Sequence, residues 1–373
     1  MRYCNKCGMP DTRPGSVFDE ESVCLACRNY ERRATIDWDK RNEELKQLCN
    51  KYRKDDGSYD CAIPVSGGKD SHRLVHIIKE EMNMNPLLIT FGDALTKTEA
   101  GKKNYRNLGE AFNCDHILFE LSIDFFRRIV RIDTEEYGEP LRFIEIGLYT
   151  VPTKLSIQLG IPLIVYGENA AYEYGTTDKE TYSGLNTVLN AYKKVNEDFL
   201  LKKGISKKEL NAIVPPTQEE LDRVKPELIF MSYFVPWSSV TNLNVARKYG
   251  FVDLTHEWQR EGCIEHFEQI DSMGYLVHLW MKYPKFGFQR VSDIASRRVR
   301  EGRLSLSQAK KLIMKYDHKL DQLALKDFIN VIGYTTKEFW DIVEKFWNRE
   351  IFEKVNGAWK LKDPLYKDSM EDE

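Results

Sequence analysis

The stretch Ser66-Gly67-Gly68-Lys69-Asp70-Ser71 decides the fold, because a strand pattern ends directly before it and a helix pattern begins directly after it. Residues 60–65 are short and mostly apolar, as is typical of a buried strand in a parallel sheet. Downstream, apolar residues recur at helical spacing, at Leu74, Val75, Ile78 and Met82. We expect Asp70 and Ser71 to cap the first turn of this helix.

The two adjacent glycines suit this junction to an anion. Gly67 and Gly68 have no Cβ atoms, so a ligand can approach the backbone closely. The free N–H groups of a first helical turn point at such a ligand, and the helix dipole favours negative charge. The sequence therefore predicts a phosphate-binding turn. A glycine turn that only joins the strand to the helix is the alternative.

The spacing of this turn differs from the Walker loop and from the dinucleotide-binding Gly-x-Gly-x-x-Gly motif. It resembles the Ser-Gly-Gly-x-Asp-Ser loop of the PP-loop ATP pyrophosphatases, which cleave ATP between its α and β phosphates. The resemblance implies that Ser66, Gly67, Gly68 and Ser71 wrap the pyrophosphate. It also implies catalytic roles for Lys69, as a cation on the phosphates, and for Asp70, as a ligand of Mg²⁺.

Length and charge restrict the possible classes of protein. A chain of 373 residues predicts two or three domains, and a hydrophobic content of 42% is enough for a packed core. The net charge of −3 does not favour a general nucleic-acid binder. No apolar run is long enough to span a membrane, and the first residues lack a signal-peptide pattern. We therefore expect a cytoplasmic protein.

Two cysteine pairs, Cys4-x-x-Cys7 and Cys24-x-x-Cys27, lie in residues 1–33 and have the spacing of a zinc ribbon. Four thiolates fill the tetrahedral coordination of Zn²⁺, which predicts a structural metal. Disulfides, or four unrelated cysteines, are the alternatives. This segment could dock a partner, contact a substrate or only cap the core.

Alternating strand and helix patterns follow a linker helix in residues 34–56. Apolar strand patterns occupy residues 60–65, 86–91, 116–119, 161–166 and 228–234. They predict a doubly wound, five-stranded parallel sheet (PP-loop, or HUP-like) over residues 57–250. An insertion at about residues 179–226 is either a lid or a solvated surface.

Ligands of such sheets bind at the carboxyl ends of the strands. Phe91 and Asp93 follow the second strand, where PP-loop proteins receive adenine or ribose, so we expect both to bind ATP. Glu168 follows the fourth strand and resembles an acid that binds Mg²⁺ or substrate. The neighbouring Asn169, Tyr172, Glu173 and Tyr174 are expected to line the substrate pocket.

Residues 251–366 read as a helical C-terminal region, and the acidic residues 367–373 as a disordered tail. We expect one helix from about Ile264 to Tyr283, others at capping boxes that begin at Ser305 and Thr335, and a terminal hairpin around Asn356-Gly357.

An arginine cluster precedes the Ser305 cap. It could hold a diphosphate or face an acidic partner, but a solvated helix face is the commoner arrangement and the one we favour. The cluster comprises Arg290, Arg297, Arg298, Arg300 and Arg303.

PP-loop enzymes differ in the nucleophile that follows adenylylation. tRNA thiolases carry sulfur on cysteines of the core, but Cys49, Cys61, Cys114 and Cys263 are all solitary here. Ammonia-using members need a glutaminase, and this chain has no Gly-x-Cys-x-Gly elbow of its own. A separate ammonia source is therefore implied if ammonia is the nucleophile.

Several motifs in order resemble the N-acetyl sugar amidotransferases of bacterial surface-polysaccharide and nonulosonic-acid pathways. They are the cysteine pairs, residues 65–71, residues 164–169, residues 283–287 and residues 293–297. The resemblance implies conversion of an acetamido group to an acetamidino group on a nucleotide-linked or nonulosonic-acid sugar, in lipopolysaccharide or related glycan biosynthesis.

The same resemblance implies ATP, Mg²⁺ and structural Zn²⁺ as cofactors. It also implies ammonia-supplying partners similar to the glutaminase and cyclase subunits of histidine biosynthesis. An ATP-dependent tRNA-thiolating enzyme is the alternative. A non-catalytic scaffold is a third possibility, which the intact glycine turn disfavours.

Overall fold

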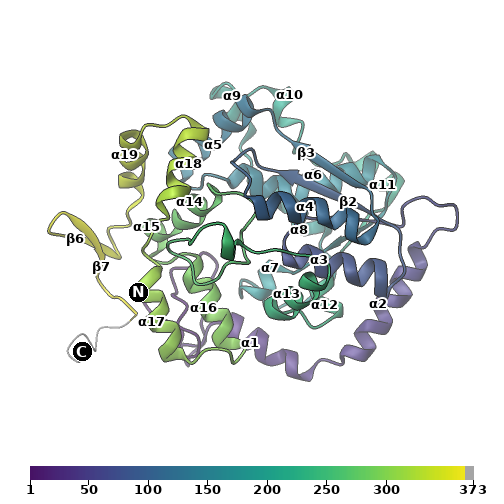
Figure 1. Cartoon of the computed structure of the whole chain (residues 1–373), viewed down its shortest axis with the longest axis horizontal. Helices are drawn as coiled ribbons and strands as arrows, with labels where there is room; N and C mark the ends of the chain where they lie inside the picture. The colour runs from purple at the N-terminus through teal and green to yellow at the C-terminus, as the bar shows by residue number, and fades with distance from the viewer. Residues whose placement is uncertain (366–373) are drawn as a thin grey trace.

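The computed structural model describes residues 1–365, so the predicted disordered tail at 367–373 lies outside the described residues. A parallel five-stranded sheet in the order β3-β2-β1-β4-β5 forms one half of the molecule, where Figure 1 labels β2 and β3. The strands are β1 (Cys61–Pro64), β2 (Pro86–Gly92), β3 (His116–Glu120), β4 (Leu163–Tyr166) and β5 (Glu227–Phe230). The predicted fold class, a doubly wound parallel sheet, is confirmed.

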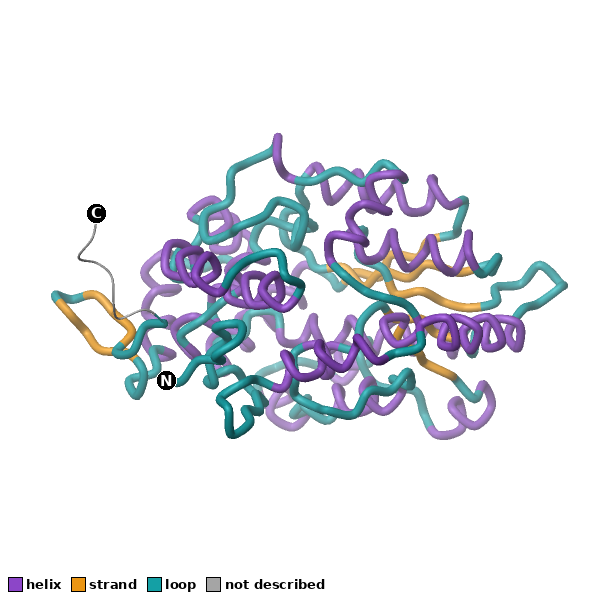
Figure 2. The backbone as a smooth tube through the Cα atoms, turned by 90° about the horizontal axis from the view of Figure 1, so that it is seen from below, coloured by secondary structure: helices purple, strands orange, loops and turns teal. Residues whose placement is uncertain are grey.

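Helices cover both faces of the sheet, as Figure 2 shows. Cys61 and Ile63 pack toward α2 (Trp38–Tyr52) and α3 (Lys69–His76), while Ala62, between them, packs toward α6 (Arg142–Gln158). This alternation follows from the two-residue period of a strand. Helix α13 (Ser239–Lys248) packs beside α3.

The strand order reverses between β1 and β4. These two strands pair only at Cys61 and Ala62, whereas β1 and β2 stay paired to Pro64. Open α/β sheets bind ligands at such a switch point, outside the carboxyl ends of the strands. The glycine turn after β1 and the Glu168 loop after β4 both lie there.

Four short helices form the insertion, and they pack against the outer surface of the sheet domain. Helix α8 contacts α6 and β5, and α11 contacts α6. No residue of 179–226 lines the cavity described below, so nothing in this arrangement favours the lid over the alternative of a surface insertion. The helices are α8 (Leu185–Tyr192), α9 (Glu197–Lys202), α10 (Lys207–Leu210) and α11 (Gln218–Val224).

The remaining elements complete the two ends of the molecule. The N-terminal half adds α1 (Leu25–Arg32), η1 (Arg33–Thr35), the π-helical turn η2 (Ile77–Glu81), α4 (Glu99–Phe112), α5 (Ile123–Tyr137) and α7 (Ala170–Glu173). The C-terminal half adds α12 (Met231–Phe234), η3 (Leu254–His256), α14 (Tyr275–Trp280), α15 (Lys282–Phe286), α16 (Arg290–Arg300), α17 (Leu306–Tyr316), α18 (Gln322–Ile332) and α19 (Thr336–Phe346). Strands β6 (Phe352–Val355) and β7 (Ala358–Leu361) form the predicted hairpin, which projects from one end.

Two sequence predictions of secondary structure are wrong. The fifth strand stops at Phe230, and residues 231–234 form α12 instead. The predicted helix 264–283 begins only at Tyr275, because residues 257–274 wrap around a buried arginine. The guanidinium of Arg260 donates hydrogen bonds to the carbonyl oxygens of Glu265, Glu268 and Gln269, so these residues cannot follow a helical path. Among residues 1–365, no helix is long and apolar enough to cross a membrane.

Candidate active site

The glycine turn has the geometry of an anion cradle. Gly67 adopts a φ of +90°, and a Cβ there would lie 3.1 Å from the backbone nitrogen of Tyr105. Ser66 N donates to Ser71 Oγ over 3.0 Å, and Gly68 N donates to Ser66 Oγ over 3.3 Å. No side chain caps α3, so the first-turn N–H groups keep their capacity for a ligand. The prediction that Asp70 and Ser71 cap this helix is wrong, because their side chains bond elsewhere.

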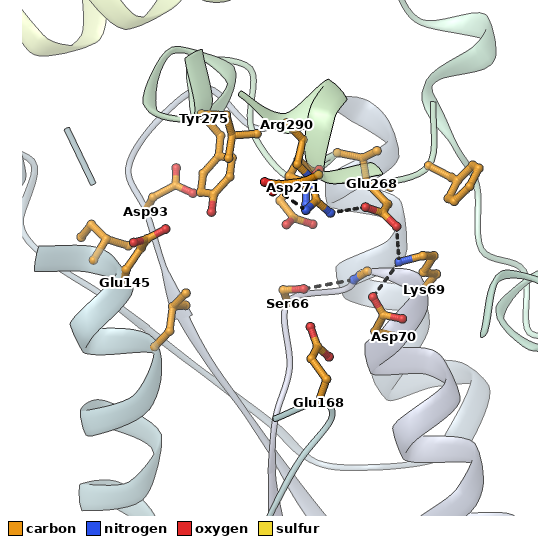
Figure 3. A pocket seen from close by; sticks show the side chains of 18 of the residues that line it. Ser66, Lys69, Asp70, Asp93, Glu145, Glu168, Glu268, Asp271, Tyr275 and Arg290 are labelled. Atoms are coloured by element: carbon orange, nitrogen blue, oxygen red, sulfur yellow. Dashed lines mark hydrogen bonds and ion pairs between the residues drawn. The ribbon is translucent and has the colours of Figure 1, made fainter. Parts of the chain in front are cut away.

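A cavity of about 470 Å³ opens above this turn (Figure 3). Five separate parts of the chain form its walls: the turn after β1, the loop after β2, the loop after β4, the start of α6, and residues 267–297. Arg13 joins them from the N-terminal segment. The cavity therefore lies where the sheet domain, the cysteine-rich segment and the C-terminal region meet.

One wall is organised around the buried carboxylate of Glu268. Lys69 Nζ lies 2.6 Å from Asp70 Oδ2 and 3.1 Å from Glu268 Oε1. Ser239 Oγ donates to Glu268 over 2.6 Å, and Arg290 and Arg297 also form ion pairs with it. These cations hold the pKa of Glu268 well below its usual value, despite the opposing effect of burial. The Lys69 ammonium is thus held beside the glycine turn by two carboxylates.

A second buried carboxylate, Asp293, organises the adjoining part of the wall. It is 3% exposed and forms ion pairs with Arg13 and with Lys282, whose Nζ lies 3.0 Å away. Arg290 NH1 lies 4.0 Å from the same carboxylate. Burial alone would raise the pKa of Asp293, but these three cations lower it.

The expectation of a solvated arginine face is therefore wrong for most of the cluster. Arg290 and Arg297 line the cavity, Arg298 pairs with the buried Glu265, and Arg300 lies 3.8 Å from Cys7 Sγ. Only Arg303, which pairs with Glu301, is largely exposed.

The opposite wall carries further carboxylates. Asp93 accepts hydrogen bonds from Leu95 N and Ser272 Oγ and lies 3.3 Å from Lys97 Nζ. Desolvation, with a smaller contribution from the nearby Asp93 carboxylate, raises the pKa of Asp271 to about 7, although Lys97 opposes the shift. Glu145 projects from α6 into the cavity. In Figure 3, Asp93, Glu145 and Tyr275 lie across the cavity from Lys69 and Asp70.

Glu168 reaches the cavity from the loop after β4, beneath Asp70 in Figure 3. The surrounding protein desolvates its carboxyl group and raises its pKa to about 7. The Asp70 carboxylate adds to this shift, and the Lys69 ammonium opposes it. The carboxylates of Asp70 and Glu168 therefore lie close together beside the anion cradle. Mg²⁺ commonly binds one or two carboxylates together with phosphate oxygens, so this arrangement fits its ligand preference.

An adjoining cavity of about 270 Å³ continues beneath the turn, between β1 and α6. Its lining is mainly apolar and aromatic, which suits a flat heterocyclic base. A Cβ on Gly147 would lie 2.1 Å from the Phe91 ring, so this glycine is what allows the ring to lie against α6. The apolar lining comprises Val65, Leu74, Ile89, Phe91, Leu148, Tyr149, Pro152 and Tyr166.

Most of the predicted site residues meet at these cavities. Ser66, Gly68, Lys69, Asp70, Phe91, Asp93 and Glu168 line the main cavity, and so does Tyr174. Gly67 shapes the turn, and Ser71 lines the apolar cavity.

Three predicted substrate residues have other positions. Asn169 caps α7 by accepting from Tyr172 N, and Tyr172 is buried with its hydroxyl 3.4 Å from Asn29 O. Glu173 pairs with Arg33 in a small side cavity that shares Lys69, Asp70 and Glu168 with the main one. None of these three lines the main cavity.

Several residues that line the cavity are not predicted as site residues from the sequence. The main ones are Arg13, Glu145, Glu268, Asp271, Lys282 and Asp293. One available signal was the spacing of Arg290, Asp293 and Arg297, which places all three on one side of a helix. Glu268 and Asp271 carry no such signal, because they lie in an irregular loop.

The four cysteines of the N-terminal segment converge. Their sulfur atoms lie within 4.8 Å of one another, with 3.8 Å between Cys4 and Cys27 and 3.6 Å between Cys7 and Cys24. A tetrahedral site with Zn–S bonds of about 2.3 Å has sulfur–sulfur edges of about 3.8 Å. The cluster can therefore hold a metal ion, and its donor set fits zinc. Among residues 1–365 it is the one group of three or more potential ligands that lie close enough to share an ion.

Comparison with known proteins gives one family match. Residues 261–366 match the family described as LPS biosynthesis protein WbpG-like, C-terminal domain. Eleven of the residues that line the cavity come from this part of the chain, among them Glu268, Asp271, Lys282, Arg290, Asp293 and Arg297.

A curated relative is the uncharacterized protein MJ1599 of Methanocaldococcus jannaschii, 23% identical over 172 residues. The match covers 46% of this chain and 60% of the relative, so the chain spans less than two thirds of that protein.

Similar solved structures include an NH3-dependent NAD synthetase from Campylobacter jejuni, with 18% identity, a TM-score of 0.30, and coverage of 58% of this chain and 96% of that one. An NMN synthetase from Francisella tularensis has 11% identity and a TM-score of 0.27, covering 60% and 100% of the two chains. A predicted tRNA methyltransferase subunit from Methanocaldococcus jannaschii has 15% identity and a TM-score of 0.28, covering 50% and 73%.

Proposed function

We propose that this chain is an ATP-dependent amidotransferase that converts the acetamido group of a sugar to an acetamidino group, with AMP and pyrophosphate as co-products. The observation that carries the proposal is the glycine turn at the end of β1, which leads into an uncapped helix and holds Lys69 beside it. Backbone N–H groups and a fixed cation suit a departing pyrophosphate. The match of residues 261–366 to a family of lipopolysaccharide biosynthesis supports a sugar as the acceptor.

The proposed reaction has two steps. The acetamido oxygen attacks the α-phosphorus of ATP, the bond to the bridging oxygen of the β-phosphate breaks, and pyrophosphate leaves with that electron pair. Ammonia then attacks the activated carbon, the carbon–oxygen bond breaks, and AMP leaves while the new nitrogen loses a proton. Placing the three reactants in one cavity supplies much of the rate enhancement.

Each part of the cavity has a role in this scheme. The first-turn N–H groups of α3 and the Lys69 ammonium hold the pyrophosphate, and the apolar cavity beside Phe91 holds adenine. Asp70 and Glu168 are the residues that would hold Mg²⁺, which neutralises phosphate charge when bound. Asp93 remains a candidate for the ribose, and the cysteine cluster would hold zinc as a structural ion.

The ammonia source and the substrate residues follow from the family resemblance. We propose that partner subunits of the glutaminase type supply ammonia. Tyr174 takes part in the acceptor pocket, and Asn169, Tyr172 and Glu173 support it by fixing the loop that carries Tyr174.

The test is incubation with ATP, Mg²⁺, ammonium chloride and nucleotide-linked acetamido sugars, with tRNA plus a sulfur donor in a parallel reaction. We expect AMP, pyrophosphate and a sugar whose mass has changed by the replacement of oxygen with NH. Asp70→Ala should abolish turnover, whereas Glu353→Gln, on the hairpin far from the cavity, should not. Turnover only in the parallel reaction, with tRNA and the sulfur donor, would contradict this proposal and indicate a tRNA thiolase.

A further inference from the structure

We propose that Arg13, Lys282 and Arg290, gathered around Asp293, form a second anion-binding subsite of the cavity, which takes the phosphate or carboxylate group attached to the acceptor sugar. The identity of the sugar rests on the proposed function. The subsite itself rests on the geometry of four side chains and can be tested without turnover.

Around Asp293, positively charged side chains outnumber the carboxylates. Three cationic side chains surround the one buried carboxylate of Asp293, through the ion pairs with Arg13 and Lys282 and the 4.0 Å approach of Arg290. Arg290 is shared with Glu268, which also neutralises Lys69 and Arg297. Lys69 also pairs with Asp70, so five cations face three carboxylates along this wall, namely Asp70, Glu268 and Asp293. The excess positive charge is unusual for a largely buried wall and favours an anionic ligand.

Arg13 keeps the most donors for a ligand, whereas Arg290 already donates from Nε to Gln269, from NH1 to Tyr174 OH and from NH2 to Glu268, which leaves one N–H on each terminal nitrogen. An arginine side chain has five N–H donors, and the polar contacts of Arg13 to Asp293 and Met9 both use NH1. Its guanidinium lies over the Tyr174 ring at 4.1 Å from the centroid, which fixes the plane of the group. Lys282 and Arg290 line the same cavity.

This subsite is separate from the pyrophosphate cradle. Lys69 pairs with Asp70 and Glu268 and makes no ion pair with Asp293, while Arg13 and Lys282 pair with Asp293. Only Arg290 approaches both buried carboxylates. One anion at each place would leave the acceptor sugar between them, next to the α-phosphate of ATP.

The N-terminal segment that carries Arg13 is attached to the C-terminal region at two places. Thr12, the neighbouring residue, donates to Phe286 O over 2.5 Å. On α16, Ser296 Oγ donates to Cys7 O over 2.9 Å and the Arg300 guanidinium lies 3.8 Å from Cys7 Sγ. Helix α16 thus carries Arg290 and Asp293 at its cavity end and packs against the cysteine cluster at its other end. The N-terminal segment, in this account, supplies a ligand-binding residue and does more than cap the core.

The test is calorimetric titration of the full, metal-loaded chain with UDP, CMP and free N-acetylneuraminic acid as probes, and with ATP as the internal reference. Arg13→Gln and Lys282→Met should weaken binding of the best probe by roughly tenfold to a hundredfold, the effect expected for loss of one charged hydrogen bond. Binding of ATP should change by less than about threefold. Arg2→Gln is the matched control, because this exposed arginine of the same segment pairs only with Asp11 on the surface.

The probes distinguish the two sources of the anion. Preference for UDP or CMP assigns the subsite to phosphate, and preference for N-acetylneuraminic acid assigns it to carboxylate. If both variants bind every probe as tightly as the wild type, or if no probe binds the wild type, the proposal of an anion-binding subsite is wrong. Far-ultraviolet circular dichroism of each variant establishes that it is folded.

A second measurement does not depend on these substitutions. Removal of the metal by a chelator should increase hydrogen–deuterium exchange in residues 290–300 and weaken probe binding, while residues 336–346 of α19 exchange as before. Unchanged exchange in residues 290–300 would contradict the link between the cysteine cluster and the subsite. Absence of AMP formation by the wild type would overturn the proposed function but would leave a positive binding result intact.

Discussion

His278 Nε2 lies 2.9 Å from Glu145 Oε1, on the wall of the cavity across from the glycine turn. The other ring nitrogen, Nδ1, accepts a hydrogen bond from Leu141 N over 3.1 Å. Because Nδ1 accepts, Nε2 carries a ring proton and donates it to the carboxylate in a hydrogen bond. The interaction with His278 holds the pKa of Glu145 below its ordinary value, against the effect of desolvation. Glu145 is therefore an oriented anion that faces the cavity.

An oriented anion at this place would bind the incoming ammonium ion. Glu145→Gln should raise the KM for ammonium by about tenfold or more, because a neutral amide attracts a cation less strongly than a carboxylate does. Hydroxylamine, which is uncharged near neutral pH, should be affected much less as an alternative nucleophile. Steady-state kinetics with both nucleophiles checks this prediction, and equal losses for the two would contradict it. Glu99→Gln, an exposed acid at the start of α4, is the control.

The pH dependence of activity should depend on Glu168. Its pKa is raised to about 7, so the free protein holds a proton there at lower pH. Mg²⁺ binds the carboxylate and not the carboxylic acid, so the affinity for Mg²⁺ should rise with pH until about pH 7 and then level off. Titration of Mg²⁺ in the presence of ATP at several pH values measures this. Glu168→Gln should bind Mg²⁺ more weakly and lose the pH dependence, and an unchanged profile in the variant would contradict the assignment.

Glu268 should matter for stability more than Lys69 does. Glu268→Gln leaves three cations, the buried Lys69 and the partly buried Arg290 and Arg297, without their shared carboxylate, and we expect it to lower the free energy of unfolding by about 3–5 kcal/mol. Lys69→Met leaves Glu268 paired with two arginines, so this variant should fold but should lose activity by about a hundredfold or more. Urea unfolding monitored by tryptophan fluorescence distinguishes the two. A Glu268→Gln variant as stable as the wild type would show that the ion pairs of Glu268 contribute little to the stability of the fold.

The features predicted from sequence are those with local determinants. The glycine turn depends on six consecutive residues, and the capping boxes at Ser305 and Thr335 each depend on a pair three residues apart. Both kinds of pattern specify geometry without reference to the rest of the chain. The parallel sheet is likewise visible as alternating apolar strands and helices.

The missed features depend on contacts between distant residues. Arg260 holds the loop 265–269 by three carbonyl groups, and a local apolar pattern there suggests a helix instead. Arg290 and Arg297 look like a solvated face, because a charged helix surface has the same sequence whether it faces water or a buried carboxylate. Glu268, which pairs with both arginines, and Arg13, which pairs with Asp293 on the same helix, come from parts of the chain that only the fold brings together.

The cysteine cluster should bind about one zinc ion per chain, in a closed site of four thiolates. Cys7→Ser should lose the metal and lower the melting temperature, because the ion links two parts of the N-terminal segment. Cys49→Ser is the matched control, since this buried cysteine packs in the core away from the cluster. Elemental analysis of the purified chain and thermal unfolding check both statements. A Cys7→Ser chain with a full complement of zinc would contradict the assignment.

The fate of the acetamido oxygen tests the central claim most directly. The acceptor sugar is labelled with oxygen-18 in its acetamido carbonyl, and the wild-type chain is given ATP, Mg²⁺ and ammonium. Phosphorus-31 spectra should show the label in AMP, with pyrophosphate unlabelled, and Lys69→Met should slow the transfer. Formation of ADP with the label in inorganic phosphate, or release of the label to water without AMP, would contradict the account.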